Sequence, residues 1–373
     1  MKQRVLIAAG GTGGHVYPAV ALAKKIKEEN PETEIFFAGC SLTESPYFDR
    51  TSFPFKEINS GKFPLKNPVT CLKSAGKVLS GIYQSRQLIK TFRPDIVVGF
   101  GSYHSLPVLI AAKMQNVPMI LHEGNAYPGK VNRFFSGYAK ATGIQFPQAS
   151  AYLRNKTYQT TMPLRPNVSH RNISRKDALA FYGFNPTKQT VLVFGGSQGA
   201  LSLNRLLEQS IAQYPGDPSL LQILHLTGHI DPQETLQKNY NAKGVLAVVK
   251  PFEEEMGYAW AVADLMIGRA GAGTIAEAIE FEVPSVFIPY PHAADDHQTK
   301  NGEYMANTVK GALLFQEESL TPKILSDTLF ELLEKNPEEK EKMKKAVREY
   351  KSTVTQYNMS ALVVELIPQR SKS

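Results

Sequence analysis

The sequence has only two cysteines and no long apolar run. Cys40 and Cys71 lie far apart, with no spacing typical of a metal site. Two isolated thiols exclude a disulfide framework, and we expect both to be reduced. No segment approaches the roughly 20 apolar residues that a membrane-spanning helix needs. The apolar stretch near the N-terminus is too short for a signal peptide, so we expect a cytosolic chain unless a surface holds it.

Acidic residues are scarce in the first half of the chain. Residues 1–165 contain 21 Lys and Arg against 9 Asp and Glu, whereas the remainder contains 21 against 25. No acid lies between Glu57 and Asp95, and none lies from 124 to 176. This imbalance predicts an anionic partner for the first half, which is either nucleic acid or an anionic membrane surface.

The segment 61–92 favours the membrane. Its cations alternate with apolar residues, and the apolar positions 78, 79, 82, 88 and 89 fall near helical spacing, as in a helix that lies in a membrane interface. The alternative is that this stripe is the core face of an ordinary surface helix. The predicted membrane patch consists of Lys62, Lys66, Leu72, Lys73, Lys77, Leu79, Ile82 and Arg86.

Short apolar strands alternate with helical runs in both halves of the chain. The pattern begins with "RVLIAAG", becomes polar and turn-like after Arg165, and restarts with "TVLVFGG". This alternation predicts an α/β fold with two doubly wound, Rossmann-like domains that face each other across a deep interdomain cleft. The expected divisions are a first domain over 1–165, a second over 166–345, and a helical segment over 346–373 that packs back on the first domain.

Glycine-rich turns follow three of the expected strands, at 10–14, 99–102 and 195–199. Ligands in open α/β sheets bind beyond the carboxyl ends of the strands. A glycine turn that opens a helix presents backbone N–H groups and the positive end of the helix to an anion. We therefore expect both domains to bind phosphate groups; the alternative is that the glycines serve only tight packing of strand against helix.

The first turn does not match a nicotinamide-binding fingerprint. Starting from Gly11, the third glycine position of G-x-G-x-x-G is Val16, and no acid follows the next strand until Glu44. An oxidoreductase is therefore disfavoured.

Three further features could carry chemistry. His15 opens a helix, whose N-terminus disfavours the imidazolium and so favours a neutral, proton-accepting ring. Glu277 could accept hydrogen bonds from a ribose diol. The group His292, Asp295, Asp296, His297 and Gln298 suits sugar hydroxyls better than a metal. The structural alternatives are a hydrogen-bonding histidine and a helix-favouring glutamate.

Taken in order, the motifs "GGTGGH", "GFGSY", "HEGN", "GGSQGA", "GRAGAGTIAE" and "HAADDHQTKN" span residues 10–301. Together they resemble the MurG family of peptidoglycan glycosyltransferases, which have the GT-B fold. The resemblance implies transfer of N-acetylglucosamine (GlcNAc) from UDP-GlcNAc to the C4 hydroxyl of the N-acetylmuramoyl-pentapeptide of undecaprenyl-diphosphate-linked lipid I. The product is lipid II, formed with inversion, and the implied role is in cell-wall biogenesis, cell shape and division.

The same resemblance assigns residues. It makes His15 the base or the group that orients the acceptor, and Arg165 and Ser197 ligands of the donor diphosphate. It places Glu277 on the ribose and Gln298 on the sugar hydroxyls. The implied acceptor-diphosphate residues are Gly13, Gly14, His15, Gly101, Ser102 and Tyr103. The implied donor residues are Thr12, Gly13, Gly14, Asn125, Arg165, Ser197, Gln198, Gly199, Phe252, Glu253, Ala272, Gly273, Thr274, Glu277 and Gln298. The chain departs from the family pattern at Gly124 and at Thr161–Met162.

The resemblance also implies no metal and no required cofactor, with UDP-GlcNAc as a substrate and a divalent cation stimulating at most. It places the protein peripherally on the cytoplasmic face of the plasma membrane. The implied partners are lipid I, an anionic membrane and other cell-wall or division proteins, but no nucleic acid. The alternatives are a glycosyltransferase of this fold acting on another lipid such as diacylglycerol, and a binding protein without catalysis.

Overall fold

The computed structural model describes residues 2–61, 68–165, 168, 173–196, 199–228, 233–354 and 357–368. The chain divides into two compact units. Unit 1 comprises Met1–Arg165 with Thr355–Ser373, and unit 2 comprises Pro166–Val354. The sequence predicts a separate helical segment that begins at residue 346. This boundary is wrong, because residue 346 lies inside helix α12 (Pro337–Thr353) of unit 2.

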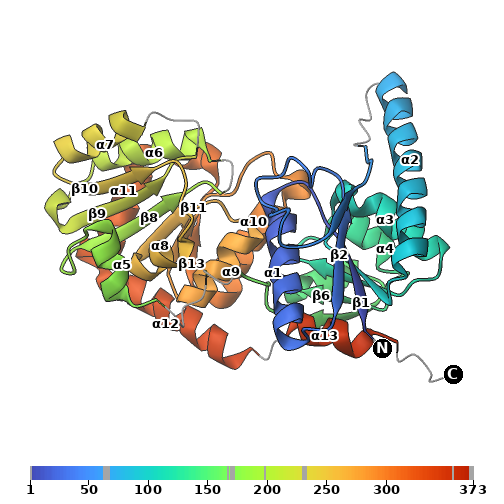
Figure 1. Cartoon of the computed structure of the whole chain (residues 1–373). Helices are drawn as coiled ribbons and strands as arrows, with labels where there is room; N and C mark the ends of the chain where they lie inside the picture. The colour runs from blue at the N-terminus through green and yellow to red at the C-terminus, as the bar shows by residue number, and fades with distance from the viewer. Residues whose placement is uncertain are drawn as a thin grey trace. The chain divides into compact units, whose positions relative to one another are not determined.

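The described part of unit 1 contains a seven-stranded parallel sheet (Figure 1). In sheet order the strands are β3 (Phe55–Glu57), β2 (Glu34–Gly39), β1 (Arg4–Ala8), β4 (Ile96–Gly99), β5 (Met119–Glu123), β6 (Ala141–Ile144) and β7 (Lys156–Gln159). The apolar runs of the sequence predict all of them except β7. This strand lies at the edge of the sheet and is mostly polar, so it lacks the apolar signal of a buried strand.

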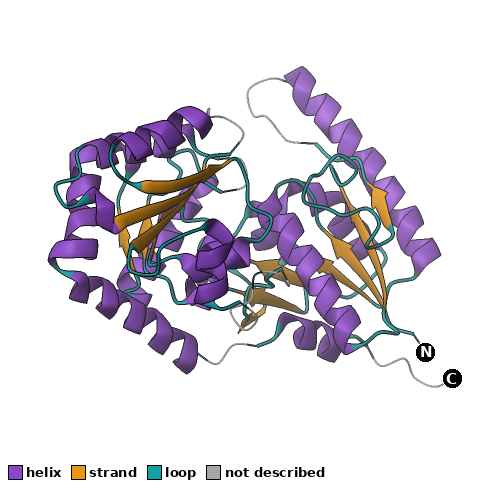
Figure 2. Ribbon diagram, turned by 60° about the vertical axis from the view of Figure 1, so that its left-hand side comes forward, coloured by secondary structure: helices purple, strands orange, loops and turns teal. Residues whose placement is uncertain are grey.

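Helices cover both faces of this sheet (Figure 2). They are α1 (Gly13–Glu29), α2 (Pro68–Phe92), α3 (Ser102–Met114), α4 (Lys130–Phe135), the 3₁₀ helix η1 (Pro147–Tyr152) and α13 (Met359–Leu366). Side chains of β1 alternate between the two faces, as a strand requires. Val5 and Ile7 pack in one core cluster with α1 and α13, whereas Leu6 packs in another with α2 and α3. Helix α13 therefore belongs to the core of unit 1.

Unit 2 repeats this winding in its described residues with a six-stranded parallel sheet. In sheet order the strands are β10 (Leu246–Lys250), β9 (Leu221–Leu226), β8 (Gln189–Phe194), β11 (Leu265–Gly268), β12 (Ser285–Phe287) and β13 (Ala312–Leu314). The remaining elements of this unit surround the sheet. They are α5 (Arg175–Tyr182), α6 (Leu201–Ala212), η3 (Pro218–Leu220), α7 (Gln233–Ala242), α8 (Met256–Val262), α9 (Ala272–Phe281), η4 (Ala294–Asp296), α10 (His297–Glu303), η5 (Tyr304–Val309), η6 (Glu317–Ser319), α11 (Pro322–Phe330), η7 (Glu331–Lys335) and α12.

Helix α5 replaces part of the turn-like stretch expected after Arg165. Its N-cap residue, Ser174, accepts a hydrogen bond from the backbone N–H of Asp177 at 3.1 Å. Gly183 ends the helix in a left-handed conformation. Both caps are standard helix signals, so this helix was predictable from the sequence.

In each sheet the strand order reverses at one point, between β1 and β4 in unit 1 and between β8 and β11 in unit 2. Ligands of doubly wound sheets bind at such switch points, beyond the carboxyl ends of the strands. The predicted glycine turns follow β1, β4 and β8, and therefore lie at these points. The expectation of two doubly wound α/β domains is confirmed.

Candidate active site

His15 lies in the first turn of α1, directly after the glycine turn that follows β1. Its Nδ1 is 2.8 Å from the carbonyl oxygen of Phe100, in the turn after β4. A carbonyl can only accept, so Nδ1 carries the proton of this hydrogen bond and the neutral ring presents Nε2 as a proton acceptor. The bond therefore gives His15 the tautomer that a general base at Nε2 needs.

The turn after β4 lies at the same switch point. Gly101 and Ser102 are both left-handed, with φ of 74° and 60°. Ser102 and Tyr103 begin α3, and the carbonyl of Tyr103 accepts a hydrogen bond from the hydroxyl of Ser60 at 2.6 Å. The residues predicted to bind the acceptor diphosphate therefore lie in two neighbouring turns, one before the N-terminus of α1 and one before the N-terminus of α3.

A buried carboxylate holds the loop after β5. Glu123 is 3% exposed and accepts hydrogen bonds from the backbone N–H of Asn125 at 2.9 Å and of Gly129 at 3.0 Å, and from Asn132 Nδ2 at 2.9 Å. Burial raises the pKa of Glu123, although the N–H donors of Asn125, Asn132 and Gly129 oppose the shift. The motif pointed to Asn125, but sequence reasoning missed the carboxylate that holds it.

A second histidine lies under this region. His122 is buried, and its ring centroid is 5.0 Å from that of Phe100. Burial, with a smaller contribution from nearby His15, lowers the pKa of His122 to about 3. His122 is therefore neutral at physiological pH and adds no positive charge beside His15.

Arg165, a predicted ligand of the donor diphosphate, is the last residue of the first segment of unit 1. Its guanidinium lies over the ring of Tyr17, 4.5 Å from the centroid. Tyr47 packs edge-on against Tyr17, with the ring centroids 5.3 Å apart. Tyr17 therefore holds the cation near the start of α1 by a cation–π contact, and Tyr47 supports the ring of Tyr17.

The glycine turn of unit 2 follows β8 and leads into α6. Gly199 has a φ of 77°, and a Cβ there would lie 2.6 Å from the carbonyl oxygen of Thr227. The turn therefore requires glycine at this position both for its backbone conformation and for its contact with β9. Ser197 and Gln198, the predicted donor residues beside it, lie outside the described residues.

A buried network supports this turn, and sequence reasoning missed it. Both ring nitrogens of His225 form hydrogen bonds. Nε2 is 3.0 Å from Asn204 Oδ1, which can only accept, and Nδ1 is 2.9 Å from the Tyr240 hydroxyl. The Asn204 amide nitrogen donates to the Thr227 carbonyl at 3.0 Å. Burial lowers the pKa of His225 to about 3. A neutral His225 therefore connects β9 to α6 next to Gly199.

Replacing Gly199 by alanine is expected to destabilise unit 2 by about 2–3 kcal/mol, because a Cβ there combines a left-handed backbone with a steric clash. Gly183→Ala is the matched control, since Gly183 has a φ of 68° but nothing within 4 Å of a Cβ. Its cost should be about 1 kcal/mol. Urea unfolding of both variants measures the difference, and equal costs would contradict the predicted clash.

Glu277 lies in α9, in the turn after the predicted donor residues Ala272, Gly273 and Thr274. The indole Nε1 of Trp260 donates to its Oε2 at 2.7 Å. Trp260 is fully buried in the core and so fixes this carboxylate at the carboxyl end of β11. A fixed carboxylate at a switch point can accept hydrogen bonds from a vicinal diol.

Phe252 and Glu253 follow β10 but differ in environment. Phe252 is 40% exposed, whereas Glu253 is buried and accepts hydrogen bonds from Lys250 Nζ at 2.7 Å and from the Tyr182 hydroxyl at 3.0 Å. Burial raises the pKa of Glu253, but these bonds and the N–H of Glu255 outweigh it and lower the pKa. The side chain of Glu253 is thus engaged within the protein, which agrees with the implication of the family resemblance that the backbone here, and not this side chain, contacts the edge of the uracil base.

Gln298 lies in α10, after the acidic segment Asp295–Asp296. Its Oε1 accepts the backbone N–H of Tyr290 at 3.0 Å, which leaves its amide nitrogen as the group that can donate to a ligand. Asp295 and Asp296 have left-handed φ values of 52° and 54° and are exposed. Among the described residues, no group of three or more His, Cys, Asp or Glu side chains is placed to hold a metal ion.

Helix α2 differs from the expected apolar stripe. Val78, Leu88 and Ile89 are buried in the core of unit 1, and Ile82 is half-buried. For the three buried positions the expectation of an interfacial stripe is wrong, and two of them, Leu88 and Ile89, belong to the core cluster that α2 shares with the sheet and α3.

The opposite face of α2 carries a second apolar stripe. Its residues are exposed by 60–76%: Val69, Leu72, Leu79 and Tyr83. At about 100° per residue, these positions share one side of the helix, away from the buried face. The flanking cations Lys73, Lys77 and Arg86 are also exposed. Lys62 and Lys66 lie outside the described residues.

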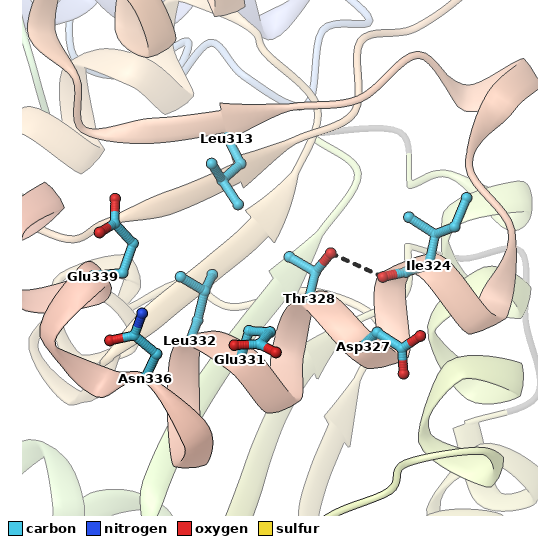
Figure 3. A pocket seen from close by; sticks show the side chains of 8 residues that line it. All are labelled: Leu313, Ile324, Asp327, Thr328, Glu331, Leu332, Asn336 and Glu339. Atoms are coloured by element: carbon cyan, nitrogen blue, oxygen red, sulfur yellow. Dashed lines mark hydrogen bonds between the residues drawn. The ribbon is translucent and has the colours of Figure 1, made fainter.

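A pocket of about 460 Å³ opens beside the edge strand β13 (Figure 3). It is lined by Leu313, Ile324, Asp327, Thr328, Glu331, Leu332, Asn336 and Glu339. Each of its three carboxylates forms an ion pair with a lysine three or four residues away in the chain. None of the predicted site residues lines this pocket, so it is not part of the candidate active site.

Over the part of the chain that the structure describes, no helix combines the length and the apolar character needed to cross a membrane. Residues 5–144 match the glycosyltransferase family 28 N-terminal domain, and residues 190–357 match its C-terminal domain.

Similar proteins match nearly the whole chain. A protein of Protochlamydia amoebophila is named UDP-N-acetylglucosamine–N-acetylmuramyl-(pentapeptide) pyrophosphoryl-undecaprenol N-acetylglucosamine transferase. It is 40% identical over 98% of this chain and 96% of its own length. A protein of the same name from Chlamydia pneumoniae is 33% identical over 91% of this chain and 92% of its own length. The crystal structure of Acinetobacter baumannii MurG matches with a TM-score of 0.76 and 29% identity, over 98% of this chain and 99% of that one. This chain therefore belongs to the MurG family within glycosyltransferase family 28 and is a glycosyltransferase of the GT-B fold.

Proposed function

We infer that this chain transfers GlcNAc from UDP-GlcNAc to the C4 hydroxyl of the N-acetylmuramoyl-pentapeptide of lipid I, which forms lipid II for peptidoglycan. The observation that carries this inference is the 40% identity, over 98% of the chain, to a transferase named for this donor and this acceptor. The site supports it, because the glycine turns of the candidate site follow β1, β4 and β8, at the switch points of the two sheets.

We propose that His15 is the general base of a single in-line displacement. Nε2 takes the proton of the acceptor hydroxyl, whose oxygen attacks the anomeric carbon as the bond from that carbon to UDP breaks. The product sugar is inverted, and the electron pair of the broken bond leaves on the UDP diphosphate. The bond from His15 Nδ1 to Phe100 supports this role, because it leaves Nε2 as the basic nitrogen.

We assign the anion-binding roles to the turns that precede helix N-termini. We propose that the turns before α1 and α3 bind the acceptor diphosphate through their backbone N–H groups. The turn before α6 and the guanidinium of Arg165 would bind the donor diphosphate, and Glu277 would bind its ribose. Asn125 would contact the sugars, held by Glu123.

We also propose that the transfer requires no resident cofactor, with a divalent cation stimulating at most. Turnover that persists in a chelating agent would support this, and turnover that falls to the background rate would refute it. Other proteins of cell-wall synthesis or division remain proposed partners.

We propose that the protein acts peripherally, at the cytoplasmic face of the plasma membrane. The exposed stripe of α2, with cations on both sides, has the composition of a surface that inserts apolar side chains among anionic headgroups. A membrane-bound acceptor requires such a surface on the enzyme.

Neutralising Lys73 and Lys77 together, as Lys73→Gln/Lys77→Gln, is expected to weaken binding to anionic vesicles by up to about 30-fold. Each cation near such a surface contributes about 1 kcal/mol, and the effect should shrink as salt is raised. The matched control neutralises Lys342 and Lys345, which are exposed on α12 of unit 2. Vesicle co-sedimentation measures both, and equal binding by the two double variants would contradict the assigned surface.

The first test of the proposed function is direct. The purified protein is incubated with UDP-GlcNAc and a short-chain lipid I analogue, UDP release is followed, and the lipid product is identified by mass. A disaccharide lipid formed in equal amount with UDP would support the proposal. Binding of UDP-GlcNAc without transfer to lipid I, but with transfer to diacylglycerol, would favour the alternative acceptor.

A further inference from the structure

His104 lies between the two glycine turns of unit 1, and the mechanism above does not use it. It is 8% exposed, in the first turn of α3. Its ring lies against Gly11, where a Cβ would be only 2.4 Å from the His104 Cε1 atom. Gly11 has a φ of 86°, so the chain adopts a left-handed conformation at the point where the ring approaches it most closely.

The second turn holds this ring from its own side. His104 Nδ1 is 3.0 Å from the hydroxyl oxygen of Ser102, which also accepts the His104 backbone N–H at 3.2 Å. The ring of Tyr103 lies alongside, with the centroids 3.9 Å apart and the planes 33° apart. The His104 ring therefore contacts both turns, through Gly11 in one and through Ser102 and Tyr103 in the other.

The two turns are connected reciprocally by two histidines. His15, in the first turn, bonds the Phe100 carbonyl of the second at 2.8 Å. His104, in the second turn, packs on Gly11 of the first. The first contact engages the ring of the proposed base, and the second places the ring of His104 against the backbone of the first turn.

We propose that His104 is a positioning residue for the acceptor: its ring holds the two glycine turns at the spacing that the diphosphate of the acceptor and the His15 base require. This inference rests on the proposed function. The ring contact with Gly11, more than the hydrogen bond to Ser102, carries the effect, because it is the contact that joins the two turns. A misplacement of about 1 Å at a reacting group can reduce a rate about 10²-fold.

Three variants separate the contacts. His104→Phe keeps an aromatic ring against Gly11 and loses the bond to Ser102. His104→Asn can keep a polar atom near the position of Nδ1 and loses the ring. His104→Ala loses both contacts, so His104→Phe is the matched variant that removes the hydrogen bond while leaving an aromatic ring in place.

The readouts are kcat, the KM for a short-chain lipid I analogue, the Kd for UDP-GlcNAc by calorimetry, and Tm. We expect kcat/KM for the acceptor to fall about 10- to 100-fold in His104→Ala and His104→Asn. It should stay within about fivefold of the parent in His104→Phe, and the Kd for UDP-GlcNAc should change less than about twofold in all three variants.

Acceptor kinetics unchanged in His104→Ala would overturn the proposal. So would a loss of donor affinity as large as the loss of acceptor kcat/KM, since a general structural defect would affect both. If His104→Ala does not fold, the comparison of the phenylalanine and asparagine variants decides, and equal acceptor kinetics in these two refute the role of the ring. Failure of the proposed function itself is recognised separately, because the unmodified protein then forms no disaccharide lipid.

Discussion

Replacing His15 by alanine is expected to lower turnover by about 10²- to 10⁴-fold, as for the loss of a general base. Nε2 is the nitrogen that can take the proton of the acceptor hydroxyl, because Nδ1 is engaged by the Phe100 carbonyl. The affinity for UDP-GlcNAc should stay nearly unchanged, since the proposed ribose and diphosphate contacts do not depend on this ring. Single-turnover rates with saturating donor, and calorimetry with UDP-GlcNAc, measure the two quantities.

Two further variants distinguish a base from an orienting group. His15→Asn can place an amide N–H near the position of Nδ1 and so keep the bond to Phe100, but it has no basic nitrogen at the position of Nε2. His15→Gln can place a polar atom near Nε2, again without basicity. If His15 is the base, both variants should be as slow as alanine. Substantial recovery in His15→Asn would instead make the bond to Phe100 the function of this residue, and would exclude the base.

The doubly wound fold was predictable because most of its strands are buried on both faces. Such strands read as continuous apolar runs, and each run of this kind ends near a glycine turn or a helix. Strand β7 was not predicted, because a strand at the edge of a sheet needs no continuous apolar run. Helix α5 was not predicted either. Taken one at a time, Ser174 and Gly183 are typical of turns, and only their spacing as N-cap and C-cap indicates a helix.

The membrane patch shows what a one-dimensional pattern leaves open. Helix α2 has apolar residues on two opposite sides, and the sequence does not say which side meets the core. The periodicity predicts Val78 at the interface, but Val78 is buried, whereas Val69 and Tyr83 lie outside the predicted patch and are exposed. Burial depends on where the helix packs, and that is decided by α3 and the sheet, which are distant in the sequence.

The residues of the candidate site also fall into two groups, those that the sequence predicts and those that only the fold reveals. The residues that we propose to contact a ligand lie in motifs, and the motifs predict His15, Asn125 and Glu277 among them. Residues that position these side chains do not lie in recognisable motifs, because a buried partner is identified only when the fold brings it into contact. In the sequence, Glu123 is one more charged residue at the end of a strand, and His225 is one polar residue inside β9. Buried polar groups need partners, so each was a signal that its partners lay elsewhere in the chain.

Replacing Glu277 by alanine is expected to weaken UDP-GlcNAc binding by about 10²- to 10⁴-fold. Two hydrogen bonds from a ribose diol to a carboxylate contribute about 1.5–3 kcal/mol each, and alanine removes both. Trp260 Nε1 also loses its acceptor in this variant, and an unpaired buried N–H costs about 1–3 kcal/mol of stability. Calorimetry with UDP-GlcNAc gives the affinity, and thermal unfolding without ligand gives the stability.

Glu277→Gln separates these two effects. Its side-chain oxygen can still accept from Trp260, so its Tm should stay close to that of the parent protein. Its hydrogen bonds to ribose hydroxyls lack the charge and should be about half as strong, which predicts an affinity loss of about 10- to 100-fold. The two variants should therefore differ in both affinity and Tm, with glutamine intermediate in affinity. If glutamine binds UDP-GlcNAc like the parent, and the loss in alanine merely follows its lower Tm, then Glu277 serves Trp260 and the ribose lies elsewhere.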